Sequence, residues 1–284
     1  MASEEYEREI QVWRQSRLTR LTAPDGWLSL IGKTFLEPRV PLAIGSAAAD
    51  GGISLPAGAP AELGTVELQA KSVRFTPAGQ TVVRIKRAGI PQPEPLTGAV
   101  ELTSDARGPS DRLFYGDLVL DVMERGDQFA VRVRDVSRAH PEFAAIEYFP
   151  IDPAWRLTAK LEPYQPEKAI DLVYESGTEQ AYYSPGALVF EKDGVEHRLD
   201  PVFESDRKRL WIVFADPTKR DSSYGAGRFL YAALPKDGQV TLDFNQAFSP
   251  PCAFSPFVAC PLPPFQNRLK VRVEAGEKRP ADHA

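Results

Sequence analysis

Tyr224 and Arg228 are side chains whose types and spacing could support chemistry. They flank Gly225 and Gly227 in the segment DPTKRDSSYGAGRFL, and glycine lets the backbone approach another group closely. Arginine recognises a carboxylate or a phosphate through two parallel hydrogen bonds, so the segment predicts an anion-binding turn. The third glycine and the strand-to-helix context of a dinucleotide site are missing. The alternative is a tight turn in which Arg228 is a buried structural residue that ties down a neighbouring loop.

A second candidate region is the proline- and phenylalanine-rich stretch 242–269, which carries both cysteines of the chain, Cys252 and Cys260. Proline removes backbone donors and fixes φ, so the stretch predicts neither a helix nor a central strand. Its apolar content is too high for a solvated linker. We therefore expect a rigid, largely buried loop that closes a binding site, with polar groups at Asn245, Asn267 and Arg268.

Catalysis by a thiol would require a neighbouring base or positive charge to ionise Cys252 or Cys260. The sequence neighbours of both cysteines are apolar, and apolar surroundings raise the pKa of a thiol. A buried unreactive thiol, a local disulfide and a catalytic thiol therefore stay open as alternatives.

Other reacting groups are few. His140, in a turn after a strand, is the one histidine whose place suits catalysis, and Asp135 and Asp152 would act as general acid or base if a cleft brought them together. Surface ion pairs are the simpler interpretation of both carboxylates. The histidines are unpaired and the cysteines lie eight apart, so the sequence predicts no metal site. A Gly-x-Ser-x-Gly elbow is also missing, which argues against an α/β-hydrolase.

The elements that must position these groups are mostly strands. One amphipathic helix is predicted from Ser3 to Leu21, with Ser3 as its N-cap, and turn residues 23–26 end it. Short alternating segments then follow, with hairpin turns at 125–127, 193–194 and 236–238. We expect a mostly β fold, an antiparallel barrel-like or sandwich domain with one N-terminal α-helix. The expected domains are a helix over 1–22 packed on the β domain, a single antiparallel β domain over 23–277, and a disordered tail over 278–284.

Composition limits the function classes. The chain has 284 residues, 43% of them hydrophobic, and a formal net charge of −5. The chain has no long basic run, which argues against nucleic acid as a partner. No apolar stretch approaches about 18 residues and the N-terminus lacks a signal-peptide pattern, so we expect a soluble, cytoplasmic protein with no membrane partner. The sequence predicts no cofactor, and it leaves the oligomeric state open.

Five segments together resemble a known family. They are GWLSLIG, VRVRD, EYFPIDPAWRLTAKLEPY, DPTKRDSSYGAGRFL and the proline-rich stretch 242–269. From about Trp13 to Glu277 the chain is similar to an uncharacterised, mainly bacterial family, domain of unknown function 1684. Ser249 departs from the family pattern, which more often has asparagine before the two prolines. The resemblance implies one shared domain architecture and supplies no catalytic assignment.

The resulting hypothesis is a pocket for a small molecule, an anionic one included, at the end of a β-barrel where the two unusual segments meet. The alternatives are a hydrolase-type enzyme that uses a cysteine, a histidine or a carboxylate in the same pocket, and a purely structural or interaction module. The residues expected to contact the ligand are Tyr224, Arg228, Asn245, Cys252, Asn267 and Arg268.

Overall fold

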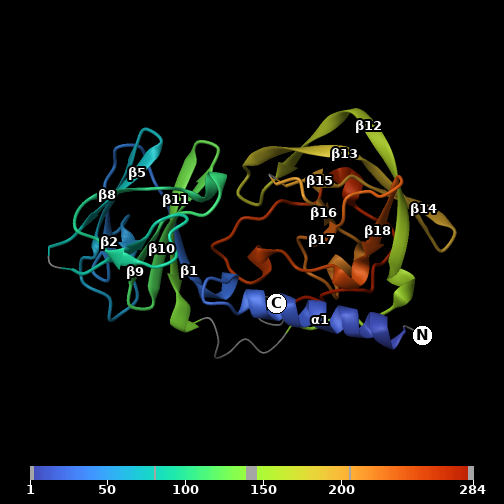
Figure 1. The fold of residues 1–284 in the computed structure, drawn as a ribbon, viewed down its shortest axis with the longest axis horizontal. Helices are drawn as coiled ribbons and strands as arrows, with labels where there is room; N and C mark the ends of the chain where they lie inside the picture. The colour runs from blue at the N-terminus through green and yellow to red at the C-terminus, as the bar shows by residue number, and fades with distance from the viewer. Residues whose placement is uncertain (1–2, 80, 139–145, 205, 281–284) are drawn as a thin grey trace. The chain divides into compact units, whose positions relative to one another are not determined.

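The computed structural model describes residues 3–79, 81–138, 146–204 and 206–280, and the chain divides into two compact units. Unit 1 comprises Met1–Leu21 and Phe143–Ala284, and unit 2 comprises Thr22–Glu142 (Figure 1). The prediction of a mostly β fold with an N-terminal α-helix is confirmed.

Unit 2 is made of short strands in two sheets, a six-stranded sheet of order β1-β11-β10-β9-β6-β7 and a five-stranded sheet of order β3-β2-β4-β5-β8. The strands are β1 (Leu30–Phe35), β2 (Leu42–Gly45), β3 (Ile53–Ser54), β4 (Gly64–Gln69), β5 (Ser72–Pro77), β6 (Arg84–Lys86), β7 (Glu94–Pro95), β8 (Val100–Leu102), β9 (Arg112–Tyr115), β10 (Leu118–Arg125) and β11 (Gln128–Asp135). Three 3-10 turns accompany them: η1 (Trp27–Ser29), η2 (Asp105–Arg107) and η3 (Val136–Arg138).

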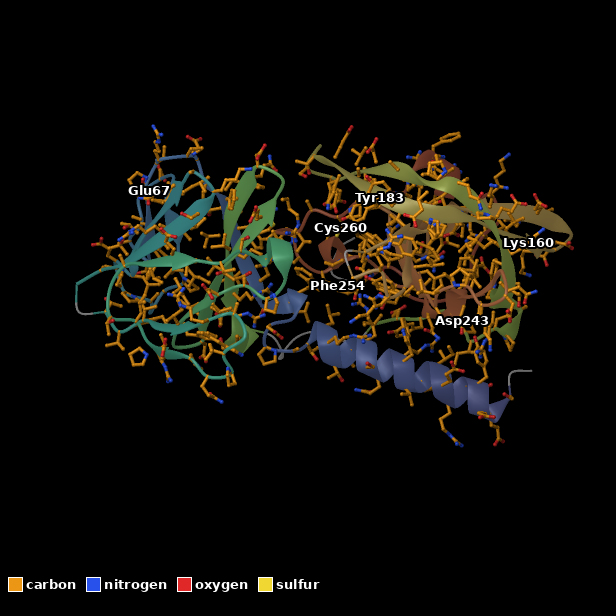
Figure 2. All side chains as sticks on the ribbon, turned by 45° about the horizontal axis from the view of Figure 1, so that its top comes forward. Glu67, Lys160, Tyr183, Asp243, Phe254 and Cys260 are labelled. Atoms are coloured by element: carbon orange, nitrogen blue, oxygen red, sulfur yellow. The ribbon has the colours of Figure 1, made fainter. Side chains whose placement is uncertain are left out.

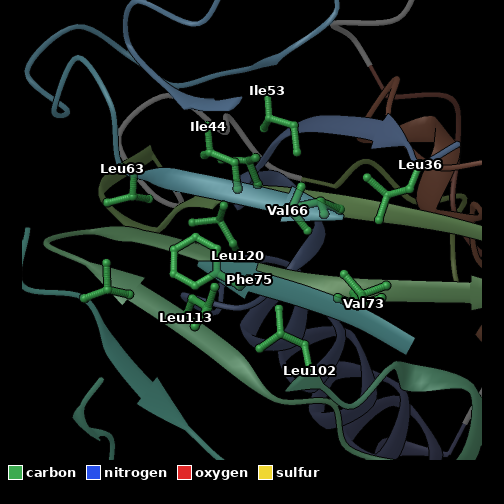
Figure 3. Packing of buried hydrophobic residues seen from close by; sticks show 14 of the residues in the cluster. Leu36, Ile44, Ile53, Leu63, Val66, Val73, Phe75, Leu102, Leu113 and Leu120 are labelled. Atoms are coloured by element: carbon green, nitrogen blue, oxygen red, sulfur yellow. The ribbon is translucent and has the colours of Figure 1, made fainter. Parts of the chain in front are cut away.

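Alternation explains how unit 2 builds its core. Successive residues of a strand point to opposite faces, and in β4 and β5 every second residue is buried. Val66, Phe75 and Leu102 from the five-stranded sheet share one cluster with Leu113 and Leu120 from the six-stranded sheet (Figure 3). The two sheets therefore bury their apolar faces in a common core.

Unit 1 combines the helix α1 (Glu4–Leu21) with a four-stranded sheet of order β14-β13-β12-β18 and a three-stranded sheet of order β15-β16-β17. Its strands are β12 (Arg156–Val173), β13 (Glu179–Lys192), β14 (Val195–Leu199), β15 (Val202–Phe203), β16 (Leu210–Phe214), β17 (Arg228–Ala232) and β18 (Gln239–Asp243). The 3-10 turns are η4 (Pro153–Trp155), η5 (Pro217–Arg220), η6 (Phe244–Gln246), η7 (Pro251–Ala253) and η8 (Phe265–Asn267).

The helix α1 lies along the side of unit 1 opposite β13 (Figure 1), and Glu9 on the helix pairs with Arg156 at the start of β12 at 3.1 Å. As predicted, Ser3 caps it, with Ser3 Oγ accepting a hydrogen bond from Tyr6 N at 3.2 Å. Tyr6 is also buried, and its hydroxyl donates to Asp243 Oδ1 at 2.9 Å. Farther along the helix, the buried Arg17 pairs with Glu277 at 2.8 Å. These contacts fasten the helix to the end of β18 and to the C-terminal segment.

The long strands β12 and β13 cover both faces of the three-stranded sheet. Their register shifts between Pro163 and Lys168, and the residues on either side of the shift pack into different clusters. Prolines interrupt the ladder because they lack a donor. Gly186 faces this bend, and a Cβ there would lie 2.3 Å from Glu162 O, so only glycine lets the backbones approach this closely. The bend places residues 168–173 beside the proline-rich loop, residues 249–264.

Two of the three predicted hairpins are confirmed, namely β10–β11 and β13–β14. The third prediction is confirmed for the turn at 236–238 and wrong for the pairing of the strands that flank it. Lys236 and Gln239 close a tight turn through reciprocal backbone hydrogen bonds of 2.9 Å, but β17 pairs with β16 and β18 pairs with β12. The turn is a local property, whereas the choice of partner strand depends on distant residues.

The range 23–277 is divided between the two compact units, and the N-terminal helix belongs to unit 1. A single domain over 23–277 stays a prediction, because compactness does not say whether the units unfold together. At the C-terminus, Lys278 N donates to Glu147 O at 2.9 Å and Arg279 N to Ser222 O at 3.0 Å, so these two residues of the expected tail are held in place. Among the described residues no sheet closes on itself, and a barrel is not confirmed.

Candidate functional site

Arg228 begins β17 and is 1% exposed. Its Nη2 donates to Asp216 Oδ1 at 2.9 Å and to Val273 O at 2.8 Å, and its Nη1 donates to Ala275 O. Burial lowers the pKa of the guanidinium, while the charge and hydrogen bond of Asp216 oppose that shift. The arginine therefore joins β17 to the segment 273–275. Arg228 is thus a buried structural residue, as the alternative interpretation of its segment expected.

Asn245, in η6, is fully buried and forms hydrogen bonds within the protein. Its Oδ1 accepts from Asp152 N at 3.0 Å, and its Nδ2 donates to Tyr6 Oη at 2.9 Å and to Asp152 O at 2.8 Å. The amide thus connects α1, the segment before η4 and the end of β18.

Tyr224 and the two cysteines lie in one apolar cluster, and Figure 2 labels Cys260 on the proline-rich loop. Both cysteines are free thiols, and Cys252 N donates to Cys260 Sγ at 3.2 Å. The hydrogen bond with Cys260, followed by burial, raises the pKa of Cys252 far above its ordinary value. Burial, followed by the charge and hydrogen bond of Cys252, raises the pKa of Tyr224. Cys252 is therefore a neutral thiol near neutral pH, which does not suit a nucleophile.

Asn267 ends η8 and organises the chain around it. Its Oδ1 accepts from Asp200 N at 2.7 Å, and its Nδ2 donates to Asp200 O at 2.9 Å and Val213 O at 3.0 Å. Ala215 and Leu269 add two backbone hydrogen bonds, Ala215 N to Asn267 O and Leu269 N to Ala215 O. These contacts determine where the next residue, Arg268, leaves the core.

An open groove of about 590 Å³ lies between β12 and the segment that contains Arg268. One wall is formed by residues 168–171 and 173, and the other by residues 262–266 and 268. Phe265 is 86% exposed at this site, which is unusual for a phenylalanine. Exposed apolar side chains of Ala169, Val173 and Phe265 are thus combined with three charged groups, those of Lys168, Asp171 and Arg268.

Two cations line the groove. Arg268 is exposed, and the acceptor for its guanidinium among the described residues is Pro263 O, 3.4 Å from both Nε and Nη2. Lys168 Nζ lies 3.7 Å from Asp200 Oδ2, and its side chain is 53% exposed. Because Asn267 holds both Asp200 and the backbone next to Arg268, one buried amide positions the surroundings of both cations.

The six predicted ligand residues are therefore not brought together in one cavity. Arg268 lines the groove, Asn267 supports it from the core, and the side chains of Arg228 and Asn245 are engaged inside the protein. As ligand contacts these residues stay a prediction. Sequence reasoning missed Lys168 and Phe265, although an aromatic residue directly after two prolines was an available signal.

The carboxylates proposed as acid or base serve as local caps. Asp135 Oδ1 accepts from Ser137 N at 3.0 Å, and Asp152 Oδ1 accepts from Ala154 N at 2.9 Å. His140 lies outside the described residues. Within the described ranges, no group of three or more histidine, cysteine, aspartate or glutamate side chains is arranged to hold a metal ion. No helix in the described part of the chain is both long enough and apolar enough to cross a membrane.

Comparisons with known proteins place this geometry in context. Residues 141–278 match the family model described as "Protein of unknown function (DUF1684)". The comparison with curated proteins found no match. Among solved structures, the chain is similar to the solution NMR structure of an uncharacterised protein from gene locus rrnAC0354 of Haloarcula marismortui, with 34% identity and a TM-score of 0.42. That match covers 50% of this chain and 80% of the archaeal chain.

Proposed function

The chain belongs, through residues 141–278, to the family described as "Protein of unknown function (DUF1684)", and we propose that it binds a small anionic ligand in the groove beside β12. The observation that carries the proposal is the place of Arg268. Its guanidinium lines the groove, and its acceptor within the described residues is a single carbonyl at 3.4 Å. An arginine in this situation retains donors for a carboxylate or a phosphate.

The remaining groove residues support a ligand with an apolar part. Ligand sites combine apolar walls with a few polar groups that orient the ligand. Here Ala169 and Val173 supply exposed apolar side chains, and Lys168 adds a second positive charge. The exposed ring of Phe265 offers a surface on which an apolar group can pack.

The proposed site lies at the surface and not in the interior, where Arg228 and Asn245 are buried. Arg228 would have to give up its ion pair with Asp216 to contact a ligand, and Asn245 would have to release α1. Such exchanges leave buried groups unpaired and cost free energy. An enzyme based on Cys252 is disfavoured, because its pKa is raised.

The fold that we propose around the site is of the sandwich type rather than a closed barrel. In unit 1 the faces of the four-stranded and three-stranded sheets contribute to one apolar cluster, as Leu188 on β13 and Ile212 on β16 illustrate. Two sheets that share a core in this way are typical of sandwiches.

Thermal-shift measurements test the binding proposal. The probes are glutarate, inorganic phosphate and short acidic peptides, applied to the wild type, to Arg268→Gln and to Arg209→Gln. Arg209 is the control because it is also an exposed arginine and does not line the groove; it pairs with Glu204 instead. A ligand present at about 100 times its Kd stabilises the native state by about 2.7 kcal/mol, which raises Tm by roughly 5–10 °C.

We expect at least one anionic probe to raise the Tm of the wild type and of Arg209→Gln. Loss of a charge-assisted hydrogen bond should weaken binding to Arg268→Gln by about 1.5–3 kcal/mol. Equal shifts in all three proteins would place the anion elsewhere. No shift with any probe would reject the groove as an anion site and favour a structural or interaction module.

A further inference from the structure

The outer edge of β12 is paired near its C-terminal end, at Val173, and has no partner strand among the described residues over 169–171. Glu175 N donates to Cys260 O at 3.1 Å, and Leu262 N donates to Val173 O at 2.7 Å. The proline-rich loop therefore runs along this edge as an antiparallel segment, with Tyr174 opposite Pro261. The next two residues are prolines, which have no N–H to continue the ladder.

The edge beyond this point lacks a partner strand among the described residues. β13 pairs with residues 168–173 of β12 on the inner side, and β18 covers the outer side over 156–160. Backbone groups of successive residues in a strand point to opposite edges. Since Val173 faces outward to Leu262, the N–H and C=O groups of Asp171 and Ala169 face outward as well, and both residues line the groove.

We propose that the ligand of this groove is a short peptide segment in extended conformation that adds a strand to β12 at residues 169–171. This inference rests on the proposed function and specifies its ligand class. An added strand would satisfy the free donors and acceptors of the edge, a recognised mode of peptide binding. The peptide takes the place along the edge that the loop leaves at Pro263.

The side chains around the edge define the chemistry of the peptide. Arg268, which has no carboxylate partner among the described residues, selects an acidic side chain. Ala169 pairs in register with Tyr183, which is 54% exposed and is labelled on β13 in Figure 2, and Val173 is 41% exposed on the same face. Cross-strand neighbours on one face pack together, so apolar side chains are favoured opposite these residues. The groove therefore fits an extended segment of alternating apolar and acidic residues.

Fluorescence anisotropy tests the proposal with fluorescein-labelled Val-Glu-Val-Glu-Val amide as the probe. Three companion peptides keep its length: one has glutamine in place of glutamate, and the other two carry N-methyl groups on alternate backbone nitrogens, one peptide for each of the two registers. We expect the peptide whose N-methyl groups face β12 to bind at least tenfold more weakly than the unmodified peptide. The glutamine peptide should bind the wild type about tenfold more weakly than the glutamate peptide does. On Arg268→Gln the two peptides should bind with equal affinity.

A pair of variants isolates the edge itself. Asp171→Pro removes the outward N–H but takes no donor from the β12–β13 ladder, and Asp171→Ala is the matched control for the lost charge. We expect the proline variant to fold, as circular dichroism and Tm will report, and to lose at least tenfold in peptide affinity relative to the alanine variant. Glutarate binding should be the same in both variants.

The outcomes separate the two proposals. Equal binding of N-methylated and unmodified peptides, with dependence on Arg268 retained, overturns strand addition and leaves the anion site standing. No binding of either peptide or glutarate rejects both. A third outcome is that the protein dimerises as its concentration rises, that Asp171→Pro abolishes the dimer and that the peptide does not inhibit it. A second copy of the chain would then occupy the edge, which overturns the peptide proposal.

Discussion

Arg228 Nη2 lies 2.9 Å from Asp216 Oδ1, and each of these two side chains is 1% exposed. An ion pair this deeply buried is costly to break, because removing one partner leaves the other charge without compensation. Asp216 also accepts hydrogen bonds from Thr218 N and Val273 N, so it fixes the chain on both sides of the pair.

We therefore predict that Arg228→Met lowers the free energy of unfolding by about 3–5 kcal/mol, as measured by urea denaturation. The double variant with Asp216→Leu should lose less than the sum of the two single variants, because the charges compensate each other. The exposed Arg268→Gln should stay within about 0.5 kcal/mol of the wild type. A wild-type stability for Arg228→Met would contradict the structural role.

Asn267 provides a second stability test. Its amide forms hydrogen bonds with Asp200 N, Asp200 O and Val213 O, all of them buried. Asn267→Ala leaves these groups unpaired, and each buried unsatisfied group costs about 1–3 kcal/mol. We expect a lower Tm together with weaker binding of groove ligands, since the same amide positions Arg268. A variant that is destabilised but binds ligands with unchanged affinity would separate Asn267 from the site.

Ser249 gives the opposite expectation. Its backbone N–H donates to Glu277 Oε2 at 2.8 Å, but its Oγ is buried without a hydrogen-bond partner among the described residues. Removing an unsatisfied hydroxyl costs no hydrogen bond, so Ser249→Ala should be neutral or slightly stabilising, within about 0.5 kcal/mol. A loss above about 1 kcal/mol in urea denaturation would reveal a partner of the hydroxyl.

Alkaline pH should destabilise the protein. The hydrogen bond with Cys260 and then burial raise the pKa of Cys252, and burial followed by the hydrogen bond to Asp243 raises the pKa of Tyr6. Burial, followed by the charge of Glu204, likewise raises the pKa of Tyr231. In the unfolded chain a cysteine ionises near about pH 8.5 and a tyrosine near about pH 10. The folded state then binds more protons than the unfolded state, so the free energy of unfolding falls as pH rises.

We expect the loss to begin near about pH 8.5 and to steepen above about pH 10, in denaturation curves recorded across this range. Cys252→Ala removes the thiol component and should delay the onset to the tyrosine range. Constant stability up to about pH 10.5 would show that these groups titrate alike in the folded and unfolded chains.

The local features of the fold could be predicted from the sequence. The helix capped by Ser3, the Asp193-Gly194 hairpin and the irregular proline-rich loop depend on neighbours within a few residues, and the structure contains all of them. Burial of β16 (Leu210–Phe214), which is apolar at both faces, also follows from its composition.

Tertiary structure decided what these elements do together. Two arginines that were both expected to contact the ligand had opposite outcomes: Arg228 is paired in the core, whereas Arg268 lines an open groove. Pairing of β18 with β12 instead of β17, and the free edge of β12 beside Pro263, likewise depend on residues distant along the chain. Turn chemistry and periodicity act over short distances, but burial and strand pairing are decided by the whole packed chain. The candidate site is therefore a property of the packed chain, while its proline-rich wall is already visible in the sequence.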